Sequence, residues 1–405
     1  MSSPSDRLFN PRFFVMCAFT FSVFLSVFQI LPVAPFHILD LGGSTFASGL
    51  FLGFLTYASA ISAPITGAIG DRFGHRRILI VSSVAIAAFS VAYGLTPGYR
   101  VVLGLAVVHG LFWSGLLSAS GAYMTSFLPE RRRAEGIGYW GLSSVLAVAV
   151  APPLGFWIYR RGWLWVCASA FVLNLAMAVI AWRLPDDGAG KAARETTGTG
   201  VSGLLEWRLL GLSATLFLYS FGYGAITSFS ALYADAIAVT PKSIYLTVMA
   251  LSILVSRPFS GRIADRFGYR RVFLPCLALI TAGLTLLALS DSRDVMVLSA
   301  IVFGVGFGTA YPTFAAYLMQ QVSPTRRGAA FGAMLAAFDT GIGTGSTLMG
   351  GLIGRFGFGR SFGVAAVLSA LAVPYFLAAD RRWGRRGVKM PSLDPSWIGD
   401  RHADQ

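Results

Sequence analysis

Three ionisable residues stand inside long apolar segments of this sequence, where a charge is costly: Asp339, Arg257 and His109. A carboxylate in such surroundings can bind and release a proton, and a guanidinium nearby changes the balance between the two states. We expect Asp339 to carry a proton and Arg257 to pair with it at a similar depth; a static structural pair is the alternative. His109 is a second candidate for proton binding, but the slightly favoured interpretation is a histidine bonded to a neighbouring hydroxyl.

The segments around these residues are long enough to cross a membrane. The 405-residue chain has a mean hydropathy of +0.67, with 55% hydrophobic and only 12% charged residues, too few charges for a soluble protein of this length. Apolar runs of about 20 residues suit a hydrocarbon core of ~30 Å, and a backbone in lipid must pair internally. The alternating pattern of an outer-membrane barrel is absent. The sequence therefore predicts an all-α membrane protein.

We expect twelve transmembrane helices in two sets of six. The first set lies at about 13–37, 46–69, 77–95, 100–127, 136–158 and 163–183, and the second at about 208–234, 242–264, 272–290, 294–321, 329–353 and 361–380. The expected domains are an N-terminal tail (1–12), an N-terminal bundle (13–183), a linker (184–207), a C-terminal bundle (208–380) and a C-terminal tail (381–405).

The basic residues indicate an orientation. A net charge of +14 is compatible with a nucleic-acid partner, but the basic residues lie in the gaps between apolar runs. With a cytoplasmic N-terminus, the inner segments hold 24 of the 32 Lys and Arg residues and the outer loops hold 7. This asymmetry follows the positive-inside rule. We expect both termini to be cytoplasmic, in a cell (inner or plasma) membrane, and no nucleic-acid partner.

The chain repeats itself at an offset of 194 residues. Residues 67–77 read GAIGDRFGHRR and residues 261–271 read GRIADRFGYRR, identical at eight of eleven positions. Gly110 and Gly304 also correspond. Two six-helix halves with a substrate site between them are the natural interpretation.

The repeated loop contains residue types suited to a gate. Its residues are Gly67, Asp71, Arg72, Gly74, Arg76 and Arg77, with the copies Gly261, Asp265, Arg266, Gly268, Arg270 and Arg271. The first glycine of each copy would allow close helix approach, and the second suits a tight turn. Each aspartate can cap the next helix or pair with an arginine across the two halves, as a latch that breaks in the other gate state. The alternative is a topology signal in which the arginines only anchor the loop.

This loop resembles the signature of the major facilitator superfamily, and the span count and the repeat extend the resemblance over essentially the whole chain. Gly141, Pro152, Pro153 and Gly155 resemble part of the helix-five motif of export-type members, although Ala151 replaces a glycine. In helix four, Ala106 stands where those members usually carry an arginine. The resemblance implies two pseudo-symmetric bundles and a secondary transporter, most similar to proton-antiporting drug and sugar exporters.

The same resemblance implies that helices one, four, seven and ten line the cavity. The candidates for substrate binding on them are Gln29, Trp113, Tyr219, Tyr223, Phe307 and Tyr311. Such aromatic residues suit a bulky, partly apolar small molecule as the substrate. We expect the protein to exchange this molecule for protons and to act as a monomer. Proton-coupled uptake and a non-transporting sensor are the alternatives. The sequence contains no hydrolase, zincin or Walker motif, so we expect no catalytic residue, metal or cofactor.

Overall fold

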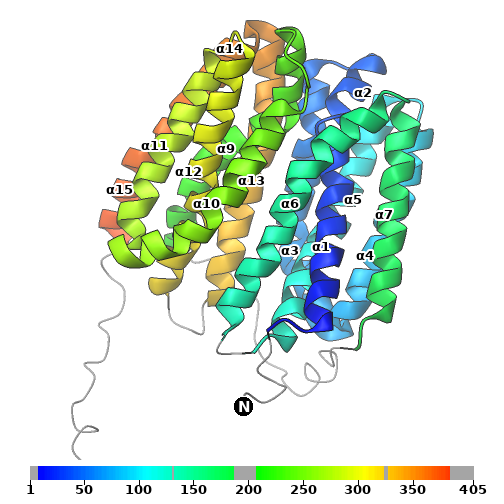
Figure 1. Cartoon of the computed structure of the whole chain (residues 1–405), viewed down its shortest axis with the longest axis vertical. Coiled ribbons are helices and arrows are strands. Elements are labelled where there is room, and N and C mark those ends of the chain that lie inside the picture. The colour runs from blue at the N-terminus through cyan, green and yellow to red at the C-terminus, as the bar shows by residue number, and fades with distance from the viewer. Residues whose placement is uncertain (1–7, 130–131, 187–206, 323–326, 384–405) are drawn as a thin grey trace, which may run out of the picture.

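The computed structural model describes residues 8–129, 132–186, 207–322 and 327–383, and every regular element in these ranges is a helix. The helices form two groups that stand side by side with their axes along a common direction (Figure 1). The first group comprises α1 (Pro11–Ile30), α2 (Ala34–Asp40), α3 (Thr45–Phe73), α4 (His75–Leu95), α5 (Tyr99–Phe127), α6 (Arg133–Tyr159) and α7 (Trp163–Arg183). The second comprises α9 (Trp207–Ala236), α10 (Ile244–Phe267), α11 (Tyr269–Ala288), α12 (Arg293–Gln320), α13 (Arg327–Phe356), α14 (Phe358–Ala370) and α15 (Ala372–Trp383).

Two of the predicted spans are each divided into two helices. The first span runs over Pro11–Asp40 but breaks between α1 and α2, where Pro32 and Pro35 lack backbone donors. The last span breaks at Leu371, just before Pro374 in the first turn of α15. The sequence patterns predicted these spans as single helices because the apolar runs continue through both breaks.

The tight turn expected in each repeated loop is present. Gly74 joins α3 to α4 with φ +92°, and Gly268 joins α10 to α11 with φ +87°. A side chain would strain the backbone at such angles, which explains the glycine in both copies. We call the end of the bundle that carries these two turns the motif end, and the opposite end the far end.

The two halves repeat the same close helix contact. A Cβ atom on Gly110 of α5 would lie 2.2 Å from the carbonyl oxygen of Leu55 on α3. A Cβ atom on Gly304 of α12 would lie 2.6 Å from the carbonyl oxygen of Met249 on α10. Both residues of the second pair lie 194 positions after those of the first, so the offset in the sequence is also a structural repeat.

The buried residues form two clusters, one mainly in each group of helices. The halves meet where α3 packs on α13 and where α6 packs on α10. Ten spans of the described chain are long and apolar enough to cross a membrane. The helices α10 and α13 are not among them, and the apolar part of α10 is shorter. The helix α10 carries Arg257 and α13 carries Asp339. Each packs on a helix of the other half, as expected for the less apolar spans of a twelve-helix bundle.

Candidate functional site

Asp339 lies in the middle part of α13, on the side that faces the other half. Its carboxylate oxygen Oδ2 accepts a hydrogen bond of 3.1 Å from the hydroxyl of Ser59 on α3. This bond joins the two halves, so it can exist only while α3 and α13 are in contact at this level. The hydrogen bonding of the Asp339 carboxylate therefore depends on the packing of the two halves.

Arg257 does not pair with Asp339, contrary to the expectation from helix depth. Its Nη1 donates instead to the carbonyl oxygen of Gly141 on α6 over 3.3 Å, and its buried Nε has no hydrogen-bond partner. The reason is the helix arrangement: α10 packs on α6 whereas α13 packs on α3, so equal depth does not bring the two side chains together.

Four of the six predicted substrate residues come together in the second half. Tyr223 of α9 stacks on Phe307 of α12, with ring centroids 4.4 Å apart and planes 10° apart. Tyr311 meets Phe338 of α13 edge-on at 5.1 Å, and Phe307 lies 6.0 Å from Phe338. Tyr219 packs behind them at 5.8 Å from Phe307 and is fully buried, so it supports the cluster. Sequence reasoning missed Phe338, although its position next to Asp339 was a usable signal.

The other two predicted substrate residues lie apart from this cluster. Gln29 is fully buried in the first half and accepts a hydrogen bond of 3.1 Å from Ser169 of α7. Trp113 is 8% exposed and packs against Phe24 of α1 with ring centroids 5.7 Å apart. Both belong to the packing among helices of the first half in this conformation.

His109 has the hydroxyl neighbour that the favoured interpretation required. Its Nδ1 lies 3.2 Å from the hydroxyl of Tyr93 on α4, and its ring stacks near Phe89 at 5.9 Å. The side chain is 3% exposed and its Nε2 has no partner in the structure. It faces α4 within the first half, away from α13, so the geometry separates it from Asp339.

The expected latch is not formed in this conformation. Asp71 interacts with His75 of its own loop, with Oδ1 and Nε2 3.2 Å apart, and its side chain is 73% exposed. The N-cap of α4 is Gly74, which has no capping side chain, and no hydrogen bond from the backbone N–H groups of α4 to Asp71 is present among the described residues. Gly261 and the side chain of Asp265 lie outside the described part, so the second copy adds nothing on this point.

The second arginine position of each loop joins the third span of a half to its last span. Arg76 of α4 donates to the carbonyl oxygens of Ala181, over 3.4 Å, and of Trp182, at the end of α7. Arg270 of α11 pairs with Asp380 of α15, with Nε and Oδ2 3.1 Å apart.

The first arginine position also repeats its surroundings. Arg72 and Arg266 each lie 5.4 Å from the ring of the phenylalanine that follows, and Arg77 and Arg271 are exposed. In both halves these arginines hold or flank the loop, which agrees with the anchoring alternative.

The helix-five residues bring α6 close to two other helices. A Cβ atom on Gly155 would lie 2.3 Å from the carbonyl oxygen of Gln29, so this glycine lets α6 approach α1. A Cβ atom on Gly141 would lie 3.2 Å from Nη1 of Arg257, so this glycine gives the guanidinium room. Pro152 and Pro153 lie inside α6, which continues through them.

Small residues close the contact between α3 and α13 at the far end, a feature that sequence reasoning missed. A Cβ atom on Gly49 would lie 2.3 Å from the carbonyl oxygen of Ser346, whose hydroxyl donates to the Gly49 carbonyl over 2.7 Å. Gly53 meets the hydroxyl of Thr347 with similar closeness. The glycines of α13 at 341, 343 and 345 let it pack on both α9 and α3.

The same face of α3 is open at the motif end. Gly67 follows Gly49 by 18 residues, five full helical turns, so both glycines face the same direction. Among the described residues, no atom of a neighbouring element lies within 4 Å of a Cβ built on Gly67, so the predicted close helix approach is not seen there. The halves are therefore in contact at the far end and apart on this face at the motif end.

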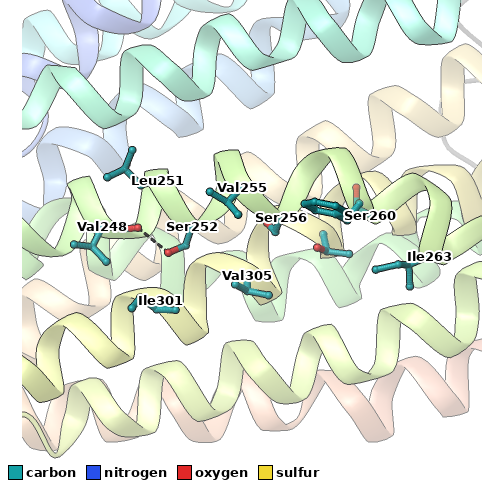
Figure 2. A pocket seen from close by; sticks show the side chains of 11 residues that line it. Val248, Leu251, Ser252, Val255, Ser256, Ser260, Ile263, Ile301 and Val305 are labelled. Atoms are coloured by element: carbon teal, nitrogen blue, oxygen red, sulfur yellow. Dashed lines mark hydrogen bonds between the residues drawn. The ribbon is translucent and has the colours of Figure 1, made fainter.

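The groove in Figure 2 lies on the other side of the second half. It encloses about 590 Å³ between α10 and α12. Val255 and Phe259 are 67% and 55% exposed and lie two residues from Arg257, about 200° around the helix. The groove therefore faces away from the charged site, toward hydrocarbon. It is lined by Val248, Leu251, Ser252, Val255, Ser256, Phe259, Ser260, Ile263, Ile301, Val305 and Thr309.

Comparison with known families agrees with this architecture. A model of the Major Facilitator Superfamily matches residues 14–254 and 212–399. The chain belongs to the Major Facilitator Superfamily. Superfamily relatives include an uncharacterized MFS-type transporter of Burkholderia mallei, 27% identical over 88% of this chain and 89% of the relative. The staphylopine export protein of Staphylococcus aureus is 24% identical over 83% of this chain and 88% of its own length.

Solved structures of the superfamily share the fold. A mutant of the nucleoside transporter NupG superimposes with a TM-score of 0.75 at 15% sequence identity, over 91% of this chain and 99% of its own. The protein is thus a multi-pass membrane transporter of the superfamily and not an enzyme.

Proposed function

We propose that the protein exports a small, partly apolar molecule in exchange for protons, with Asp339 as the proton carrier. The observation that carries this proposal is the hydrogen bond from Ser59 to Asp339 across the two halves. A hydrogen bond to a charged group contributes about 1.5–3 kcal/mol, so the ionised carboxylate favours the arrangement in which α3 and α13 touch. Protonation removes the charge, so the neutral group can be enclosed again when α3 and α13 come back together.

The orientation follows from charge. The basic loops of the motif end belong on the cytoplasmic side by the positive-inside rule, which places both termini there. The far end would then face outward, and the present conformation would be open toward the cytoplasm. In this state the ionised Asp339 is paired with Ser59 and the protein is ready to accept its substrate from inside.

In the proposed exchange cycle, the contact between α3 and α13 first opens and then closes again. Substrate binding from the cytoplasm precedes separation of α3 from α13 at the far end, which breaks the Ser59 bond and exposes Asp339 to the outside. A proton then neutralises the carboxylate, and the halves close again around the uncharged group. Export as the direction is supported by the staphylococcal relative, whose name describes an export protein, and by the helix-five residues near Gly155.

The test uses purified protein in liposomes and a substrate found by counterflow with a panel of metabolites and drugs. Asp339→Asn mimics the protonated side chain, so it should abolish transport driven by a pH gradient and preserve exchange at equal pH on both sides. Asp294→Asn is the matched control because Asp294 is an exposed acid at the start of α12. Gradient-driven accumulation by Asp339→Asn would refute the role of Asp339. Accumulation in the direction of proton flow would establish uptake instead of export.

A further inference from the structure

The guanidinium of Arg257 is a partly buried cation with no counter-ion among the described residues. Among the residues that the structure describes, no carboxylate lies within 4.0 Å of it. Its single hydrogen bond, to Gly141, is long at 3.3 Å, and its Nε is buried with no partner. A guanidinium has five N–H donors, and leaving them unpaired inside a membrane is costly. Such an arrangement is expected where a bound ligand completes the set.

The surroundings of Arg257 come from both halves. The helix of Arg257, α10, packs on α9 and α12, which carry Tyr223 and Tyr311, and Gly141 of α6 belongs to the other half. A site between the halves is where an alternating-access transporter binds its substrate. Gly141 leaves room for the guanidinium, because the Cβ atom of any other residue at this position would lie 3.2 Å from Nη1.

The same tyrosines belong to the aromatic cluster. Tyr223 stacks on Phe307, and Tyr311 meets Phe338 edge-on. Flat apolar surface therefore lies beside an unpaired cation. A carboxylate fits a guanidinium through two parallel hydrogen bonds, and an aromatic or planar apolar group packs on such rings.

We propose that this site binds an organic anion, with its carboxylate or similar anionic group on Arg257 and its planar apolar part against Tyr223, Phe307, Tyr311 and Phe338. The proposal rests on the proposed transport function, because it names the substrate class of the same protein. Asp339 is held on the α3 side by Ser59, and no ion pair joins it to Arg257 among the described residues. The anion and the proton therefore occupy separate positions and are exchanged through the movement of the halves.

The experiment measures thermal stabilisation of the purified protein by three compounds of nearly equal shape. They are 2-naphthoate, which is an anion, 2-naphthylmethanol, which is neutral, and 2-naphthylmethylammonium, which is a cation. Only 2-naphthoate should raise the melting temperature in a saturable manner. Arg257→Gln should weaken its apparent affinity roughly tenfold or more, as expected for losing hydrogen bonds to a charged group. Arg262→Gln, an exposed arginine on the same helix, is the matched control and should behave as the unchanged protein.

Equal stabilisation by the three compounds, or no stabilisation by 2-naphthoate, would overturn the proposal. Unchanged affinity in Arg257→Gln would overturn it as well. If that variant does not fold, Arg257→Lys keeps the charge and should retain selectivity for the anion with weaker binding; loss of that selectivity counts against the proposal. Asp339→Asn should still bind 2-naphthoate. Gradient-driven transport that persists in Asp339→Asn, with 2-naphthoate binding intact, would therefore refute only the proton mechanism. Loss of proton coupling in Asp339→Asn, without selective binding of 2-naphthoate by the unchanged protein, would refute only the anion site.

Discussion

Substituting Gly49 by valine should prevent the far end from closing. In the closed contact, the Cβ atom at this position would lie 2.3 Å from the carbonyl oxygen of Ser346, whereas ordinary contacts begin at 3.4 Å. The obstacle is backbone and cannot rotate away, so α3 and α13 must part by about 1 Å at this point. Overpacking of this kind costs about 1–3 kcal/mol, which shifts the balance of two conformations by about 5- to 150-fold. The expected result is a larger population that is open at the far end.

Spin labels can measure this shift. Cysteines replacing Arg161 and Asp291, exposed at the far end of the first and second halves, report the separation of the two halves once Cys17, Cys167 and Cys276 are removed. Gly49→Val should move the label distances to longer values than those of the unchanged protein. Gly104→Val is the matched control, because a Cβ atom there meets nothing within 4 Å. Identical distance distributions in Gly49→Val and the unchanged protein would refute the assignment of this contact as the far-end gate.

Three further outcomes are expected from the structure. Gly110→Val and Gly304→Val should both lower the melting temperature by several degrees, because each places a side chain against the backbone of a neighbouring helix; a change in only one would contradict the equivalence of the two contacts. His109→Gln should leave the pH dependence of transport unchanged in the liposome assay, because His109 is bonded to Tyr93 within the first half; a displaced pH profile would make it a proton site. Reporter fusions after Gly188 and at the C-terminus should both read cytoplasmic, and an external signal from either would reverse the proposed orientation.

Much of the fold could be predicted from the sequence, because the features that specify its helices and turns lie within short segments. Apolar length predicts helices, and the 194-residue repeat predicted that Gly74 and Gly268 would form equivalent turns, which the structure contains. The divisions at Leu31–Val33 and at Leu371 were missed because hydropathy does not change where a helix bends at proline.

The candidate site was predicted only in part because it depends on how helices rotate and pack. Depth along the sequence placed Arg257 and Asp339 at one level, but it carries no information about which neighbour each helix faces. The same limit explains Gln29, which lies on a predicted cavity helix yet points into the first half. The aromatic residues of α9 and α12 lie together, as expected for helices that line one cavity, and their role in substrate binding stays a prediction.

Proton release on substrate binding tests the central claim most directly. The protein is purified in weakly buffered detergent solution near neutral pH, the substrate is added, and the pH change is recorded. Because the substrate binds the form in which Asp339 is ionised, the exchange mechanism predicts release of up to about one proton per chain, the capacity of a single carboxyl group, and no release from Asp339→Asn. The same release from Asp339→Asn, or no release from the unchanged protein over the whole pH range in which it transports, would contradict the account.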